Sequence, residues 1–293
     1  MKRSFGKEIP RFVILATILI MTGVTPLFAA PFFSTGNPDG LMATASRPSS
    51  AGKIEVESAD DFLLGSSASI TNATFTGLLT NASTSNIGQV VVEVYRVFPN
   101  DSDVGRTSGA PTFSTSQVPT RVNSPSDVAF DTRDSASGNL SFTTTSLGTF
   151  TANNSVLNGI NPKPGQTTGG NGAVTGTEVL FNVTFKTPFN LPADHYFFIP
   201  QVQVTTANGE FYWLSAPRPI AGTPFNPDLQ SWIRNDNLAP DWLRVGTDIV
   251  GGTTPPTFNG AFSLTGTVPE PGSMLFLGFG LISLIGVSRK FKK

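Results

Sequence analysis

Cysteine is absent from the 293 residues, and histidine occurs once, at His195. Without cysteine the chain has no disulfide framework, no thiol nucleophile and no Cys-ligated zinc. An exported form of the chain must therefore be held together by its core alone. A body of about 200 residues is large enough to bury such a core.

Charge is also scarce, because only 13% of the residues are charged and the formal net charge is -1. Nucleic-acid binding needs cationic side chains that neutralise phosphates, and the body of the chain has no basic patch. We therefore expect no nucleic-acid partner. Phenylalanine is abundant, with 24 residues, and Thr, Ser, Asn and Gly lie between alternating apolar residues. This composition is typical of an all-β protein.

The start of the chain has the order of a secretory signal peptide over residues 1–30. Four basic residues lie around the start of an apolar run at residues 12–24, and the small pair Ala29 and Ala30 follows. Signal peptidase would cut after one of these two alanines, and the sequence leaves both positions open. The mature chain is then exported.

The end of the chain is predicted to cross a membrane. Residues 273–288 are uncharged and mostly apolar, and with their Pro/Gly lead-in they form a helix of about 25 Å, which just reaches across a hydrocarbon core. A basic cluster follows at Arg289, Lys290, Lys292 and Lys293. Because such residues are retained on the cytoplasmic side, everything before the helix is expected outside.

A proline-rich tetrapeptide, Val268, Pro269, Glu270 and Pro271, precedes this helix. Its prolines cannot continue the helix upstream and they favour extended backbone, which a protease can read. Tetrapeptide, helix and basic cluster together resemble the PEP-CTERM sorting signal of Gram-negative bacteria over residues 268–293. The resemblance implies recognition by a membrane-bound exosortase, removal of the helix, and delivery to the cell surface or to the exopolysaccharide matrix of a biofilm. An ordinary C-terminal membrane anchor is the alternative.

The residues between the two ends divide into a segment without periodicity and a long region of strand patterns. Residues 31–52 contain Asn-Pro, Asp-Gly and Arg-Pro steps, which predict an extended, partly mobile segment. Residues 53–267 are predicted to form one antiparallel, jelly-roll-like β-sandwich, since short strand patterns recur along them at irregular spacing. The clearest strand pattern, at residues 178–186, places Val179, Phe181, Val183 and Phe185 on one buried face.

Two local patterns add a hairpin and one short helix to this predicted β-sandwich. An Asn-Gly step at residues 208–209 predicts a hairpin between strands at 196–204 and 211–214. The spacing of Leu229, Trp232 and Ile233 predicts one short helix within residues 227–242, and it would be the only helix of the sandwich.

Catalytic candidates are few. His195 adjoins Asp194, and a triad with Ser215 is disfavoured because neighbours on a strand point to opposite faces. A glycosidase needs two facing carboxyl groups about 5 to 10 Å apart. The five glutamates of the body are isolated in the sequence and are interpreted as solvated surface: Glu55, Glu57, Glu93, Glu178 and Glu210. A secreted carbohydrate-active hydrolase nevertheless stays open as the alternative function.

Two binding sites are also predicted. Asp101 and Asp103 lie in a turn that suits calcium, the one cofactor the sequence suggests, and Asp60 and Asp61 could add ligands. Aromatic rings match the apolar face of a sugar, so Tyr212, Trp213, Trp232 and Trp242 could form a glycan-stacking platform unless they are core residues. The leading interpretation is a non-enzymatic exported protein of the cell envelope or extracellular matrix that is structural or contacts carbohydrate.

Overall fold

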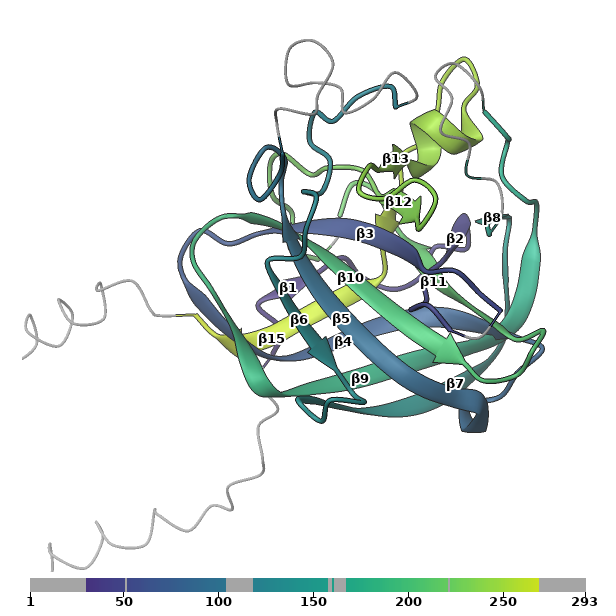
Figure 1. Cartoon of the computed structure of the whole chain (residues 1–293), viewed down its shortest axis with the longest axis horizontal. Coiled ribbons are helices and arrows are strands. Elements are labelled where there is room, and N and C mark those ends of the chain that lie inside the picture. Colours follow the sequence, from purple (N-terminus) through teal and green to yellow (C-terminus); the bar gives the residue numbers. More distant parts are fainter. Residues whose placement is uncertain are drawn as a thin grey trace, which may run out of the picture. The chain divides into compact units, whose positions relative to one another are not determined.

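The computed structural model describes residues 30–50, 52–103, 118–157, 160, 167–220 and 222–268. The described part is built from two β-sheets (Figure 1), so the predicted all-β class is confirmed. The predicted signal peptide and the predicted membrane helix lie outside the described residues. Within the described residues, no helix is both long and apolar enough to cross a membrane.

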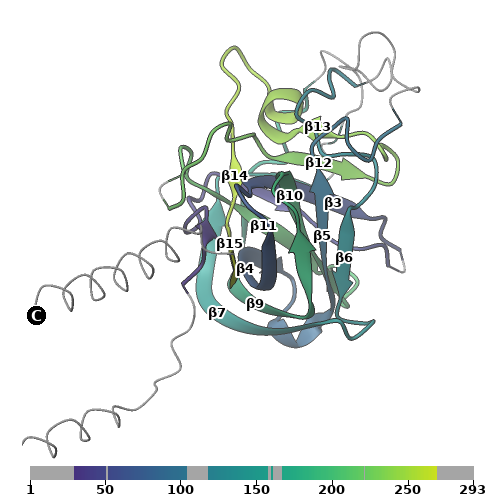
Figure 2. The same cartoon turned by 90° about the vertical axis from the view of Figure 1, so that its left-hand side faces the viewer.

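The first sheet has nine strands, of which β4, β7 and β9 are the longest; β9 pairs with β4 on one side and with β7 on the other (Figure 2). Its members are β1 (Phe33–Ser34), β2 (Met42–Ala45), β4 (Ala68–Thr80), β7 (Leu140–Ala152), β8 (Asn154–Val156), β9 (Val174–Leu191), β11 (Glu210–Ala216), β14 (Asn259–Gly260) and β15 (Phe262–Thr267). Among the described strands, β2 and β8 form the one parallel pair. Residues 140–152 form β7 as one continuous strand.

The second sheet has six strands in the order β13-β12-β3-β10-β5-β6. These are β3 (Val56–Leu63), β5 (Ile87–Arg96), β6 (Asp131–Asp134), β10 (His195–Val204), β12 (Trp232–Asn235) and β13 (Leu243–Arg244). Two short helical turns accompany the sheets, a 3-10 turn at Thr84–Asn86 and a π-type turn at Val245–Val250.

The main hydrophobic core lies between the facing sides of the two sheets. Val179, Phe181, Val183 and Phe185 of β9 are all buried, as their alternation predicted. Phe181 stacks on Phe75 of the same sheet with ring centroids 4.7 Å apart. Phe198 of the second sheet stacks on Phe262 of the first at 4.8 Å. The contact of Phe198 with Phe262 joins the facing sheets without a disulfide.

The predicted hairpin between residues 196–204 and 211–214 is wrong. β10 lies between β3 and β5 in the second sheet, whereas β11 lies between β4 and β2 in the first. Both edges of β10 are occupied, so the turn through Gly209, whose amide bonds to the carbonyl of Thr206 at 3.1 Å, leads the chain across to the other sheet. An Asn-Gly step specifies a turn but not the sheet that the next strand joins.

The predicted helix within residues 227–242 is also wrong. Trp232–Asn235 is the strand β12, which pairs with β3 and β13. Trp232 and Ile233 are both buried, and they belong to different hydrophobic clusters. Adjacent apolar residues at this position indicate a strand covered on both faces, which local spacing cannot distinguish from one turn of helix.

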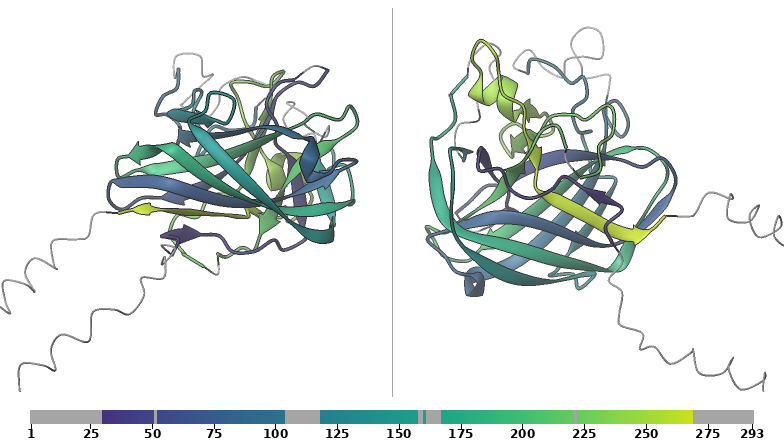
Figure 3. Two further views of the ribbon diagram at one scale, coloured as in Figure 1. Left: turned by 90° about the horizontal axis from the view of Figure 1, so that it is seen from below. Right: turned by 180° about the vertical axis from the view of Figure 1, so that it is seen from behind.

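Residues 31–52 are predicted as an extended segment ahead of the sandwich, but their described part supplies two strands of the first sheet. β1 pairs with β15, and β2 pairs with β11 and β8. β1 is thus joined to the last strand of the described chain, as the views from below and behind show (Figure 3). The extended backbone was predicted, but its place inside a sheet was not.

The outer face of the second sheet is also covered. Ala59, Tyr95 and Phe197 point away from the main core and pack in a separate buried cluster with Trp232 and Trp242. Charged residues of β3, β5 and β12 share this covered face, and they form the candidate site.

Candidate functional site

A buried network of charged side chains lies on the covered face of the second sheet. Arg234 of β12 stands opposite Glu57 of β3 in the strand register. Its NH2 group bonds to Glu57 Oε1 at 3.0 Å, and its Nε contacts the other carboxylate oxygen. The pair is bidentate and almost fully buried, with 6% of Arg234 and 3% of Glu57 exposed. Such a pair is geometrically specific but also desolvated.

Tyr95 of β5 joins this ion pair to a second carboxyl group. Its hydroxyl accepts a bond from Arg234 NH2 at 2.7 Å and lies 3.0 Å from Glu57 Oε1 and 3.2 Å from Glu93 Oε2. Burial, followed by the charge of Glu57, raises the pKa of Glu93 to about 8. Near neutral pH the Glu93 carboxyl group is therefore largely protonated in the folded protein, beside the Tyr95 hydroxyl.

The same arginine contacts the two segments that cover the outer face of the second sheet, around residues 126–127 and 240–242 (the covering segments). Arg234 NH1 donates to the backbone carbonyls of Asp127 at 3.2 Å and Pro240 at 3.3 Å. Its guanidinium lies 4.3 Å from the ring centroid of Trp242, whose indole nitrogen bonds to the carbonyl of Ser126 at 3.1 Å. Sheet and covering segments are therefore connected through one cation.

A second acidic pair lies further along β3. Asp61 Oδ2 is 2.5 Å from His195 Nε2, and both of its oxygens accept the amide of Leu229 at 3.1 Å. Burial raises the pKa of Asp61 to about 6, although the bond to His195 opposes the shift. Its neighbour Asp60 is fully buried, and burial raises its pKa well above the ordinary value.

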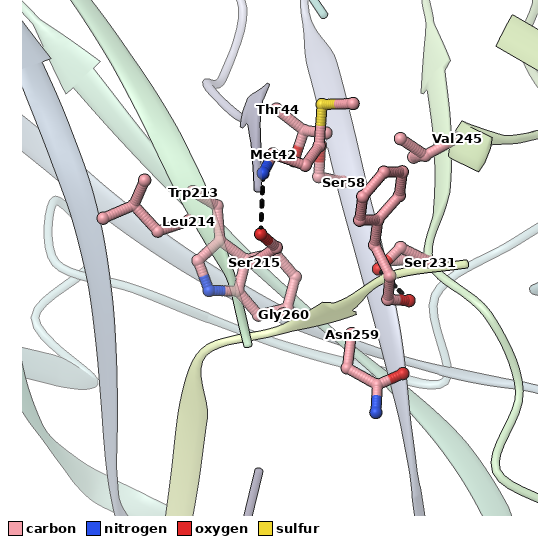
Figure 4. Close-up of a pocket in the computed structure, with 12 residues that line it drawn as sticks. Met42, Thr44, Ser58, Trp213, Leu214, Ser215, Ser231, Val245, Asn259 and Gly260 are labelled. Carbon is pink, nitrogen blue, oxygen red and sulfur yellow. Dashed lines mark hydrogen bonds between the residues drawn. The ribbon is translucent and has the colours of Figure 1, made fainter. Parts of the chain in front are cut away.

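His195, Asp194 and Ser215, the residues considered for a triad, each have a separate partner in the structure. His195 bonds to Asp61, and the carboxylate of Asp194 lies 3.5 Å from Arg96. Ser215 Oγ accepts the amide of Met42 at 2.8 Å (Figure 4). It also donates to Asp39 at 2.5 Å. Ser215 lines an internal void of only about 10 Å³, which is too small for a substrate.

The predicted calcium turn has other partners in the structure. Asp101 Oδ2 lies 3.8 Å from Arg96, and the backbone amide of Asp103 bonds to Asp127 at 2.9 Å. Asp60 and Asp61, proposed as additional ligands, are buried in β3. Among the described residues no group of three or more acidic or histidine side chains could hold a metal ion. Calcium binding at Asp101 and Asp103 stays a prediction.

The four aromatic residues of the predicted glycan-stacking platform are buried, so they do not form an exposed platform. Tyr212, Trp213, Trp232 and Trp242 are all core residues, and none of them is more than 6% exposed. Tyr212 and Trp213 belong to β11, a strand buried along its whole length, while Trp232 and Trp242 pack in the separate buried cluster on the outer face of the second sheet. Their rings pack against protein and offer no open face to a sugar.

The predicted sorting tail begins directly after the last strand of the described chain. β15 ends at Thr267, and Val268, the first residue of the tetrapeptide, follows it directly with 38% of its surface exposed. The end of β15 is paired with β4, where Thr267 stands opposite Ser69. Pro269, Glu270, Pro271 and the basic cluster lie outside the described residues. The tetrapeptide therefore begins at the last residue of a sheet, with no linker between them.

Comparison with known families decides the identity of this tail. A family model for the PEP-CTERM protein-sorting motif matches residues 267–290. The chain carries a PEP-CTERM sorting signal. It is therefore an exosortase substrate, exported as a membrane-anchored precursor before processing. No curated protein and no solved structure matches the chain.

The PEP-CTERM match covers only the tail, so it does not explain the buried charged network of the body. The sequence did not predict this network. Glu57 and Glu93 were interpreted as solvated surface, yet they meet at Tyr95. A local signal was available, because Arg234 directly follows the apolar pair Trp232 and Ile233. A cation in so apolar a strand requires a buried partner. The identity of that partner depends on strand order, which the sequence did not reveal.

Proposed function

We propose that the processed protein is a non-enzymatic component of the cell envelope or of the extracellular polymer matrix. One observation carries this proposal: the buried charged groups connect parts of the body to one another. Arg234 joins Glu57 to the carbonyls of Asp127 and Pro240, so its hydrogen bonds are used within the chain. Charged residues used in this way favour a rigid structural role.

Carbohydrate is the partner class that we propose for such a role. The PEP-CTERM signal supports carbohydrate as the partner, since resemblance to this class of signal implies delivery to the cell surface or to an exopolysaccharide matrix. The test is a glycan array probed with the processed protein recovered from the cell surface. Retention on acidic or neutral polysaccharide would support contact with the matrix polymer. The same protein denatured by heat is the control, and equal retention of both forms would argue against a folded glycan-binding surface.

A secreted hydrolase is the second candidate, because one observation favours it. Glu57 and Glu93 flank the Tyr95 hydroxyl, and the raised pKa of Glu93 suits a general acid. The two carboxyl groups nevertheless lie beneath covering segments, and Glu57 is only 3% exposed. We expect no release of reducing sugar from extracellular polysaccharide. Turnover that is lost in Glu93→Gln, but kept in Glu178→Gln on the half-exposed part of β9, would establish the hydrolase instead.

A further inference from the structure

An uncharged hollow lies at the base of the sorting tail. It has a volume of about 390 Å³, and its lining includes Ser67, Ala68, Asn190, Leu191, Pro192 and Thr267. Ala68 and Leu191 are buried and form its apolar floor, whereas Ser67, Asn190 and Pro192 are exposed. No lining residue carries a charge. Apolar floors with polar rims are typical of surfaces that bind another protein.

The length of the tail keeps this hollow close to the membrane in the precursor. Thr267 lines the hollow, and the predicted membrane helix begins at residue 273. Six extended residues span at most about 20 Å, so the hollow cannot lie further than that from the start of the helix. The tetrapeptide is closer still, because its last residue lies within about 15 Å of Thr267. The part of a membrane-embedded protease that reads the tetrapeptide must therefore come within about 15 Å of Thr267.

We propose that the membrane-embedded processing protease docks on this hollow while it reads the tail. The proposal rests on the PEP-CTERM assignment and adds a recognition surface on the folded body. A protein partner fits the hollow better than the lipid surface does. Its lining has no cationic side chain to draw it to anionic lipid, and no aromatic ring to insert between headgroups.

Single charges placed at the rim provide the test. Asn190 is exposed near the end of β9, and Asn182 is an exposed asparagine on the same strand, eight positions or about 26 Å away. The processing rate of the full chain is measured by pulse-chase in a host that contains the protease. Asn190→Asp and Asn190→Lys should each slow processing about tenfold, because either charge would be desolvated in the docked complex. Asn182→Asp and Asn182→Lys should leave the rate unchanged.

A second variant pair excludes a folding defect and tests proximity. Ser67→Asp, in the loop before β4, should slow processing as Asn190→Asp does, with thermal unfolding unchanged in both. Inserting about ten Gly and Ser residues between Thr267 and Val268 adds a reach of roughly 17 Å. The insertion should make the rate insensitive to the charge at Asn190, because the protease no longer has to meet the hollow.

Two results would overturn the docking proposal. Equal processing rates for all rim and control variants would mean that the tail alone is read. Faster processing of Asn190→Lys together with slower processing of Asn190→Asp would assign the hollow to the anionic lipid surface. Neither result would affect the sorting assignment, which is tested separately by the loss of processing when Pro269 and Pro271 are changed to Ala.

Discussion

Phe32 donates its backbone amide to the carbonyl of Leu264 across 3.0 Å. The residue directly before β1 is thereby bonded to β15, the last strand before the PEP-CTERM motif. The start of the predicted mature chain and the exit of its sorting tail consequently share one edge of the body. Because β15 ends at Thr267, we expect cleavage within or after the tetrapeptide to leave the strand pairing of the body intact.

Replacing Phe181 tests the main core. Its ring is fully buried and stacks on Phe75. Phe181→Ala should lower the free energy of unfolding by about 3 to 5 kcal/mol, because it removes buried surface and leaves a cavity. Urea denaturation of the variant measures this loss. Phe142→Ala, at a half-buried ring on the neighbouring strand β7, is the control and should cost clearly less; equal costs would contradict the assigned burial.

The ion pair of Arg234 and Glu57 can be tested with a double-mutant cycle. Arg234→Met leaves Glu57 as a buried carboxylate without its cation, and we expect a loss of about 3 to 5 kcal/mol. Adding Glu57→Gln removes the unpaired charge and should recover part of this stability. Chemical denaturation of the wild type, both single variants and the double variant gives the coupling. Additive losses would mean that the two side chains do not interact.

Glu93 should make the stability of the protein depend on pH. Its pKa is raised from 4.5 to about 8, mainly by burial and then by the charge of Glu57. The folded protein therefore binds a proton that the unfolded chain releases at lower pH. The stabilising contribution is fully present below about pH 4.5 and is lost as pH rises through about 8.

Asp61, whose pKa is raised to about 6, acts in the same direction over a lower pH range. Thermal unfolding of Glu93→Gln should show a weaker decrease between about pH 6 and 8 than the wild type, because the amide cannot lose a proton. Identical pH profiles for the two proteins would contradict the buried, protonated state of Glu93.

Calcium binding at the turn of Asp101 and Asp103 is tested by titration calorimetry. The prediction from the sequence is a weak site, and Asp101→Asn should abolish its heat. Asp101 also lies near Arg96, which competes for its carboxylate. If calcium gives no heat, and chelator leaves the thermal unfolding temperature unchanged, the turn has a structural role only.

The sequence predicted those features that depend on local pattern. The alternation of Val179, Phe181, Val183 and Phe185 identified a strand and its buried face, because side chains of a strand alternate between two faces. The PEP-CTERM motif was likewise identified locally, since its three parts are contiguous in the chain.

Features that depend on strand order could not be predicted in this way. Trp232 and Ile233 suggested a helix because a strand covered on both faces has no alternation to detect. The meeting of Glu57 with Arg234 joins residues 177 positions apart in the chain. The sequence predicts that isolated carboxylates such as Glu57 and Glu93 are solvated, because nothing local shows that the outer face of the second sheet is covered.

Mass spectrometry of protein recovered outside the inner membrane tests the sorting account most directly. In a host with an exosortase, we expect the wild-type protein to have lost the residues that follow the PEP-CTERM tetrapeptide. With Pro269 and Pro271 changed to Ala, the protein should stay in the membrane fraction at full C-terminal length. Wild-type protein recovered outside the inner membrane that still carries residues 276–293 would contradict the account and leave the tail as an anchor only.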